Sequence, residues 1–151
     1  MHRTLVLLAL VGCSKSEPAP TVAPPAPKSQ VSEAKQGELQ KDIDQAMQVG
    51  TWNELRHKWQ GLELTWTVTR HAVLCNSAER CNVAAFPVER PAKQGWLPAL
   101  TFAPGEFDKL AGACGKADCD FTFRGTIDEV RGSDAEPAAI RFKDVVFVKK
   151  A

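Results

Sequence analysis

The apolar residues of this 151-residue chain change their spacing at Leu62, and that change constrains the fold more than any other feature. Before Leu62 they recur every three to four residues, as on one face of a helix. After it they alternate with polar residues, which is the pattern of a strand with one buried face. The alternating residues are Leu62, Leu64, Trp66 and Val68, interleaved with Glu63, Thr65, Thr67 and Thr69. The sequence therefore predicts a helical lead followed by a mainly β domain of the α+β class.

Two amphipathic helices are expected in the helical lead. The first ends at Gly50, and Thr51 with Glu54 then has the form of a capping box that starts the second. Gly61 is expected to end the second helix. The apolar stripes are Leu39, Ile43 and Ala46/Met47 in the first helix, and Trp52, Leu55 and Trp59 in the second. We expect the tryptophans of the second helix to pack in the core against a sheet.

Four more strands and one short helix are expected after the first strand. Pro104–Leu110 has the composition of one or two helical turns, with Gly112 near the end. Asp144 interrupts the last strand and indicates a register shift or a bulge. The expected strands are Cys81–Phe86, Leu97–Phe102, Phe121–Ile127 and Ile140–Val148, with a loop at Pro87–Gly95 and a turn-rich stretch at Arg131–Pro137.

This order, β-β-β-α-β-β after a helical lead, resembles the OB-fold, a five-stranded Greek-key barrel with a helix between its third and fourth strands. Phe121–Ile127 and Ile140–Phe147 resemble the closing hairpin of bacterial OB-like export proteins. Gly125 is expected to point inward, where a glycine eases the coiling of the strand, and Thr126 to point outward. The resemblance covers Leu62–Lys149, and a β-sandwich or a lipocalin-like half barrel is the alternative.

The N-terminus carries an export signal. His2 and Arg3 precede an apolar run, Thr4–Val11, which is shorter than the roughly 20 residues that span a bilayer. The sequence Leu10-Val11-Gly12-Cys13 that ends this run resembles the lipobox of bacterial lipoproteins. The resemblance implies that residues 1–12 are removed and that Cys13 is acylated as the mature N-terminus. Ser14 then favours the periplasmic face of the outer membrane, and an ordinary signal peptide is the alternative.

A tether is expected at residues 13–30, because residues 14–30 contain five prolines and no Leu, Ile, Phe or Trp. Such a segment cannot bury enough apolar surface to fold, and in extended form it would reach about 50 Å. The helical lead then covers 31–61 and the barrel 62–151. The chain has a formal net charge of +1, and residues before Val31 contribute +2, so the domain lies near −1. This balance argues against a general nucleic-acid binder.

Four cysteines follow Cys13, and an even number in an exported protein indicates two disulfides. They are Cys75, Cys81, Cys114 and Cys119. Local pairing, Cys75–Cys81 and Cys114–Cys119, is favoured among the three possible connectivities. A zinc site of four thiolates is the alternative, but zinc sites usually space paired cysteines by two to four residues, which fits only the second pair.

No catalytic motif, cofactor site or metal site is recognised in the sequence, and His57 and His71 are expected at the surface. We therefore expect a non-catalytic binding or adaptor module for an envelope protein, peptide or glycan. OB-folds bind through their second and third strands and through the loops between strands 1–2 and 4–5, here Asn76–Arg80 and Arg131–Pro137. The candidate ligand contacts are Arg70, Arg80, Arg90, Lys93, Trp96, Arg124 and Arg131. A small envelope hydrolase and an oligonucleotide-binding domain are the alternatives.

Overall fold

A computed structural model describes residues 30–77, 80–88, 96–133 and 136–151. Residues 1–29, which include Cys13 and nearly all of the expected tether, lie outside the described residues. The helices and strands are, in chain order, β1 (Gln30–Val31), α1 (Gln36–Val49), α2 (Trp52–Trp59), β2 (Leu62–Ser77), β3 (Arg80–Pro87), β4 (Trp96–Phe102), α3 (Glu106–Cys114), β5 (Asp120–Ser133) and β6 (Glu136–Lys150).

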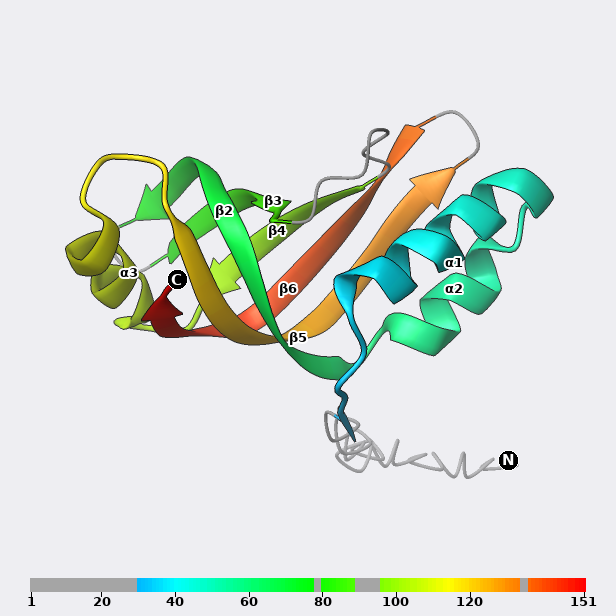
Figure 1. The fold of residues 1–151 in the computed structure, drawn as a ribbon, viewed down its shortest axis with the longest axis horizontal. Helices are drawn as coiled ribbons and strands as arrows, with labels where there is room; N and C mark the ends of the chain where they lie inside the picture. Colours follow the sequence, from blue (N-terminus) through cyan, green and yellow to red (C-terminus); the bar gives the residue numbers. More distant parts are fainter. Residues whose placement is uncertain (1–29, 78–79, 89–95, 134–135) are drawn as a thin grey trace, which may run out of the picture.

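Five of these strands close into a barrel. β2 pairs with β3, β3 with β4, β4 with β6, β6 with β5, and β5 again with β2. The β4–β6 pair is parallel and the other four pairs are antiparallel. The two-residue β1 adds to the start of β2 in parallel. The mainly β class and the expected order of three strands, a helix and two strands are confirmed (Figure 1).

Three strands run further than the sequence pattern predicted. β2 continues to Ser77, eight residues beyond the alternating run that ends at Thr69. β5 and β6 extend into the expected turn-rich stretch, where Arg131 pairs with Ala139 and Ser133 with Glu136. Pairing with a neighbouring strand supplies hydrogen bonds to polar segments that have weak strand propensity of their own. The expected binding loops are correspondingly shorter than predicted.

The closing pair leaves long free strand segments. β2 and β5 pair only over Glu63–Thr69, which lie opposite Thr126–Asp120. Because the two strands are antiparallel, their unpaired lengths project at opposite ends of the barrel. At one end β5 continues through 127–133, and at the other end β2 continues through 70–77.

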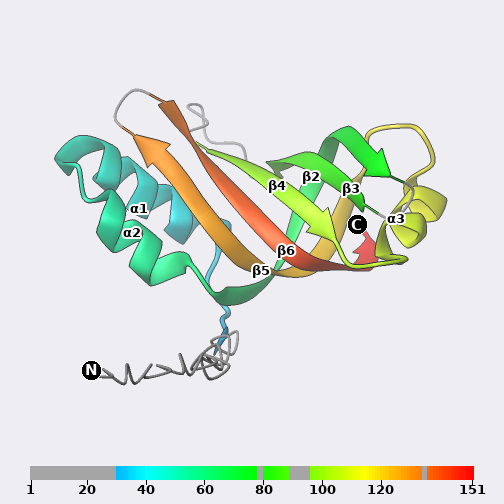
Figure 2. The same cartoon turned by 180° about the vertical axis from the view of Figure 1, so that it is seen from behind.

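Helices α1 and α2 cover the projecting end of β5 (Figure 2). The ring of Trp52 lies directly on the backbone of Gly132 and leaves no room for a side chain there. Trp59 is 1% exposed and donates its Nε1–H to Asp42 on α1 at 2.7 Å. Its ring centroid lies 6.3 Å from that of Trp66 on β2. The tryptophans of the helical lead therefore pack in the core, as predicted.

Helix α3 lies at the opposite end of the barrel from α1 and α2 (Figure 1). The connection that follows it is held by Arg70, whose side chain is only 5% exposed. Arg70 donates Nη1–H to the carbonyl of Gly115 at 3.0 Å and Nη2–H to the carbonyl of Ala117. The Cys114–Cys119 disulfide bridges the same connection. This arginine therefore fixes the end of α3 to the barrel.

Gly125 lies where the barrel wall bends. It faces the barrel interior opposite Leu64, and a Cβ on it would lie 2.9 Å from Cγ2 of buried Val145. The neighbouring strand β6 has a bulge at this place. Between the pairs Arg124–Val146 and Thr126–Lys143, β6 has one more residue than β5.

The bulge residue is Asp144, as the sequence indicated. Its φ of 52° is in the left-handed region, which aspartate adopts more readily than most residues with a side chain. Thr126 pairs with Glu63 and Lys143 on the outer side but is only 8% exposed. The exposed Thr65 is thus the better outward-facing reference position.

We predict that Gly125→Val destabilises the barrel by about 1–3 kcal/mol, because the added side chain overlaps Val145 in a packed core. The matched control is Thr65→Val, an exposed position on β2, which should change the free energy of unfolding by less than about 0.5 kcal/mol. Urea unfolding of the oxidised domain measures both. Equal and small changes in the urea midpoint of the two variants would contradict the prediction that Gly125 faces the interior of the barrel.

Candidate functional site

Two of the seven candidate contact residues are buried. Trp96 is 1% exposed and stacks in the core, with its ring centroid 5.8 Å from that of Trp66. Arg70 is occupied by the carbonyls that end α3. Neither presents its side chain to a ligand at the surface, so the structure corrects the expectation that they contribute to binding. Both residues are buried for the same reason: each occupies a position of its strand at which the side chain points into the barrel.

The side chains of three further candidates, Arg80, Arg90 and Lys93, lie outside the described part of the chain. Arg90 and Lys93 fall within 89–95, outside the described residues, together with most of the expected loop Pro87–Gly95. Arg80 begins β3 and pairs with Ser77, but only its backbone is described.

The last two candidates, Arg124 and Arg131, are exposed and paired with carboxylates. Arg124 lies 3.9 Å from Glu63, and Arg131 lies 2.6 Å from Glu129. The hydrogen bond that Arg131 donates to the carboxylate of Glu129 raises the pKa of Arg131 above its ordinary value, so this guanidinium stays charged. Two further cations on β6 complete a surface that we call the paired-charge face. Its ion pairs are Arg124–Glu63, Arg131–Glu129, Arg141–Glu129 and Lys143–Asp128.

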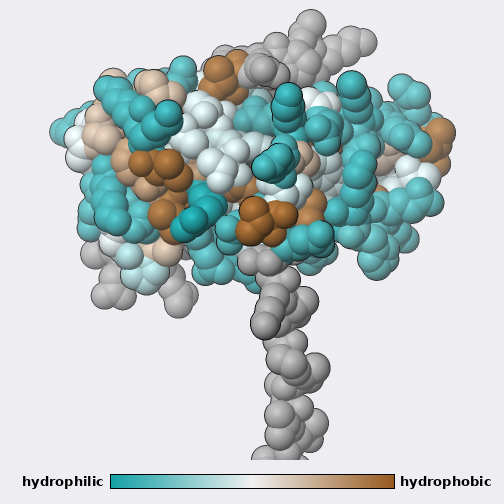
Figure 3. All heavy atoms as spheres, turned by 60° about the horizontal axis from the view of Figure 1, so that its bottom comes forward, coloured by the Kyte–Doolittle hydropathy of each residue, from teal (hydrophilic) through white to brown (hydrophobic). Residues whose placement is uncertain are grey.

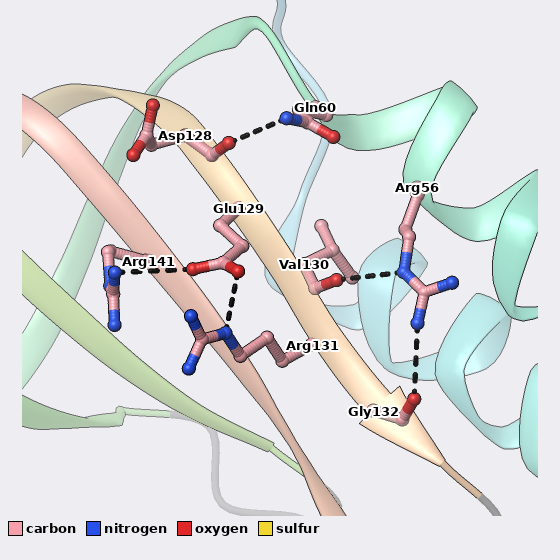
Figure 4. Close-up of polar contacts among 8 residues, drawn as sticks. All are labelled: Arg56, Gln60, Asp128, Glu129, Val130, Arg131, Gly132 and Arg141. Carbon is pink, nitrogen blue, oxygen red and sulfur yellow. Dashed lines mark hydrogen bonds and ion pairs between the residues drawn. The ribbon is translucent and has the colours of Figure 1, made fainter.

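A polar groove of about 460 Å³ lies between α2 and the projecting end of β5 (Figure 4). Arg56 donates its Nε–H to the carbonyl of Val130 at 3.1 Å and its Nη2–H to the carbonyl of Gly132 at 3.3 Å. Gln60 donates to the carbonyl of Asp128 at 2.8 Å. The groove is lined by Arg56, Gln60, Glu129, Val130, Arg131, Gly132 and Ser133. Arg56, the main cation of the groove, is therefore hydrogen-bonded to the backbone at the free edge of β5. The groove is a structural contact between α2 and β5.

The two histidines of the domain lie on different elements. His57 is exposed on α2, and His71 is exposed on β2 with its ring 4.5 Å from that of Phe86. Both surface positions were predicted. Among the described residues, no three His, Cys, Asp or Glu side chains are grouped so that they could hold a metal ion.

The cysteines are bonded in local pairs. Cys75 is joined to Cys81 across the β2–β3 hairpin, and Cys114 to Cys119 beyond α3. This is the connectivity that the sequence favoured. The alternative zinc site would need all four thiolates free and gathered at one point, whereas here each sulfur is bonded to another.

A second surface, which we call the uncharged face, covers the outer side of β2, β3 and β4. The strand register aligns its residues in rows: Ala72, Ala84 and Ala99 lie side by side, as do Leu74, Asn82 and Thr101. Leu74 is 68% and Leu97 44% exposed. The face consists of Ala72, Leu74, Asn82, Ala84, Phe86, Leu97, Ala99 and Thr101. None of these eight side chains is ionisable, and the face is bordered by His71, whose ring packs against Phe86, and by Arg141, which pairs with Ala99.

Few aromatic rings are available at the surface, and on the uncharged face the half-buried Phe86 packs against His71. The chain has four tryptophans, seven phenylalanines and no tyrosine. All four tryptophans are buried, and every phenylalanine is buried or half-buried. Figure 3 shows the underside of the view in Figure 1, where hydrophilic residues cover most of the surface and apolar residues form small separate patches. Binding modes that stack a sugar or a base on an aromatic ring therefore have few rings available.

Sequence reasoning missed the uncharged face because it searched for cations and tryptophans. The available signal was the segment Cys81–Phe86, in which the outward-facing positions are Asn82, Ala84 and Phe86. An antiparallel strand with one solvated face usually carries charged or strongly polar residues there.

No protein-family model, curated protein or solved structure matches the chain. Among the described residues, no helix combines the length and the apolar character needed to cross a bilayer. The function must therefore be argued from the surfaces themselves.

We predict that Arg56→Ala destabilises the domain by about 1–2 kcal/mol, because it removes the donors to the carbonyls of Val130 and Gly132. The control is Lys58→Ala on the same helix. Lys58 forms an exposed ion pair with Asp42, and its loss should cost less than about 1 kcal/mol. Urea unfolding compares the two variants, and a smaller effect for Arg56→Ala than for Lys58→Ala would contradict the capping role.

Proposed function

We propose that this chain is a lipid-anchored lipoprotein of the bacterial envelope whose barrel binds another envelope protein without catalysing a reaction. The anchor is supported by the sequence Leu10-Val11-Gly12-Cys13 and the proline-rich segment that follows it. Acylation of Cys13 would hold the domain at the periplasmic face of the outer membrane, with Ser14 as the sorting signal. Several acyl chains on one cysteine give an anchor that does not dissociate readily.

An OB-like Greek-key barrel is the finer description that we propose for the fold. In the order of the five barrel strands, the third and fifth, β4 and β6, are parallel neighbours. The first and fourth strands, β2 and β5, close the barrel. Helix α3 connects the third strand to the fourth. These connections support the OB-like assignment over a β-sandwich, in which the two sheets would remain separate.

The uncharged face carries the binding proposal. It lies on β3 and β4, the second and third strands of the barrel, and OB-folds bind ligands at this place. Its flat row of Ala72, Ala84 and Ala99 lets a polypeptide approach the sheet closely. A partner that meets it would bury apolar and backbone surface without leaving a charge unpaired. All four tryptophans are buried, and this scarcity of exposed aromatic rings favours a protein or peptide over a glycan.

The paired-charge face supports the same choice of partner. A surface for polyanions offers unpaired cations whose binding releases counterions. Here Arg124, Arg131, Arg141 and Lys143 each have a carboxylate within 4 Å. These cations would have to give up their partners to contact phosphates, so an oligonucleotide is the weaker candidate.

The anchor is tested by Cys13→Ser. We expect this variant to remain uncleaved by the lipoprotein signal peptidase and to lose incorporation of a fatty-acid analogue, because the thiol is the acylated atom. The measurement is metabolic labelling followed by gel analysis, with Cys75→Ala as the control that keeps the lipobox intact. Labelling that persists in Cys13→Ser would exclude Cys13 as the acylation site.

The binding surface is tested by photo-crosslinking in the native bacterium. We incorporate p-benzoyl-phenylalanine in place of Leu74 or Leu97 on the uncharged face, or in place of Arg124 on the paired-charge face. Adducts with one envelope protein are expected at the first two positions and not at the third. Ala84→Arg, which places a charge in the middle of the row Ala72, Ala84 and Ala99, should abolish both adducts, whereas Thr65→Arg should leave them. Equal adducts at all three positions would contradict the proposed surface.

A further inference from the structure

The projecting end of β2 has a free edge. β5 pairs with β2 only as far as Thr69, and the next backbone contact on that side is from the N–H of Arg70 to the carbonyl of Cys119 at 2.9 Å. Beyond Arg70, β2 continues to Ser77 and pairs with β3 alone. Residues Ala72, Val73, Leu74 and Cys75 of this stretch are all exposed.

The register shows which backbone groups point out of this edge. Across Cys75 and Cys81 the Cα atoms are 4.1 Å apart, the short spacing of an antiparallel pair that is not hydrogen-bonded. The N–H and C=O of Cys75 therefore point away from β3. Pairs alternate along the strand, so Val73, two residues earlier, has the same orientation. Among the described residues, no group is hydrogen-bonded to this side of Val73 or Cys75.

The free edge of β5, by contrast, is protected by a helix. There Arg56 and Gln60 of α2 donate to the carbonyls of Asp128, Val130 and Gly132. In the part of the chain that the structure describes, no helix donates to the β2 edge, and residues 72–74 carry no charge and no proline. Charge, proline and covering elements are the usual means of preventing a strand edge from pairing with another chain. Within the described ranges, the edge of β2 at residues 72–74 has none of these three protections.

We propose that the partner inserts an extended segment as a strand beside β2 at Val73–Cys75, next to the uncharged face. This inference rests on the proposed function and specifies its mode. The N–H and C=O groups of Val73 and Cys75 provide main-chain hydrogen bonds, and alternate side chains of the added strand lie beside Ala72 and Leu74. Because those side chains are apolar or small, the inserted segment is uncharged and rich in apolar residues.

A segment of another protein fits this edge better than a second copy of this chain. A stable interface between two folded copies needs about 800 Å² from each. The described edge between Ala72 and Cys75 is short, and two barrels that met there would have to supply the rest from rigid surfaces. An extended segment follows the edge and the neighbouring uncharged face without that constraint.

The variant Val73→Pro distinguishes strand pairing at the edge of β2 from binding to the uncharged face alone. Proline removes the N–H that points out of the edge but none that pairs with β3, and such positions tolerate proline. With p-benzoyl-phenylalanine in place of Leu74 or Leu97 in the full-length chain, we expect Val73→Pro to lower both adducts about tenfold. Val73→Thr, which keeps the N–H, should change them less than about twofold. Where Val73→Pro lowers the urea midpoint, Val73→Lys replaces it, because a charge on the edge also blocks pairing.

Each result has one meaning. Loss of both adducts in Val73→Pro, with retention in Val73→Thr, supports strand addition. Adducts that persist in a folded Val73→Pro variant but disappear in Ala84→Arg overturn strand addition and leave the proposed function standing. Adducts that join two copies of this chain overturn the proposed occupant. No adduct at either position without further substitution overturns the proposed function itself.

Discussion

The seven-residue pairing between β2 and β5 is the constraint on which the rest of the molecule depends. It closes the barrel, but both strands are about twice as long as the closure, so each projects at one end. Backbone groups on a projecting edge need partners or water. At the end of β5 these partners are side chains of α2, so the helical lead supplies the hydrogen bonds that the projecting strand needs. The same contact packs the ring of Trp52 against the backbone of Gly132. At the end of β2 the hairpin is held by a disulfide and its outer edge stays open.

The distribution of charge follows from the same architecture. Strands β5 and β6 form a long antiparallel ribbon, and opposite residues on its outer side carry opposite charges, as in Glu129 with Arg141. Cross-strand pairs of this kind add a little stability and satisfy each other, which leaves few cations for a ligand. The outer residues Ala72 and Leu74 of β2, 82–86 of β3 and 97–101 of β4 are uncharged instead. A surface of that composition is suited to contact with another polypeptide, and it adjoins the open edge of β2.

Much of the fold could be predicted from the sequence. The alternation after Leu62, the helical stripes before it and the position of α3 all depend on local periodicity, and each was placed correctly. The bulge at Asp144 was also visible, because aspartate inside an apolar run is a local signal. The candidate site was not predictable in the same way. Arg70 and Trp96 were treated as surface residues because of their chemical type, but each continues the alternation of its strand, and that alternation turns both side chains inward.

The sequence by itself determined the order of helices and strands and the local disulfides, and the proposed anchor rests on the residues Leu10-Val11-Gly12-Cys13, because each depends on residues that are close together in the chain. Only the tertiary structure decided how far each strand runs, since the pairing of β5 with β6 carries polar residues that have no strand preference of their own. It also decided which strand edge is covered and which is open. Coverage of an edge requires contacts such as that between Arg56 and Val130, which are distant in sequence and meet only after the barrel has closed.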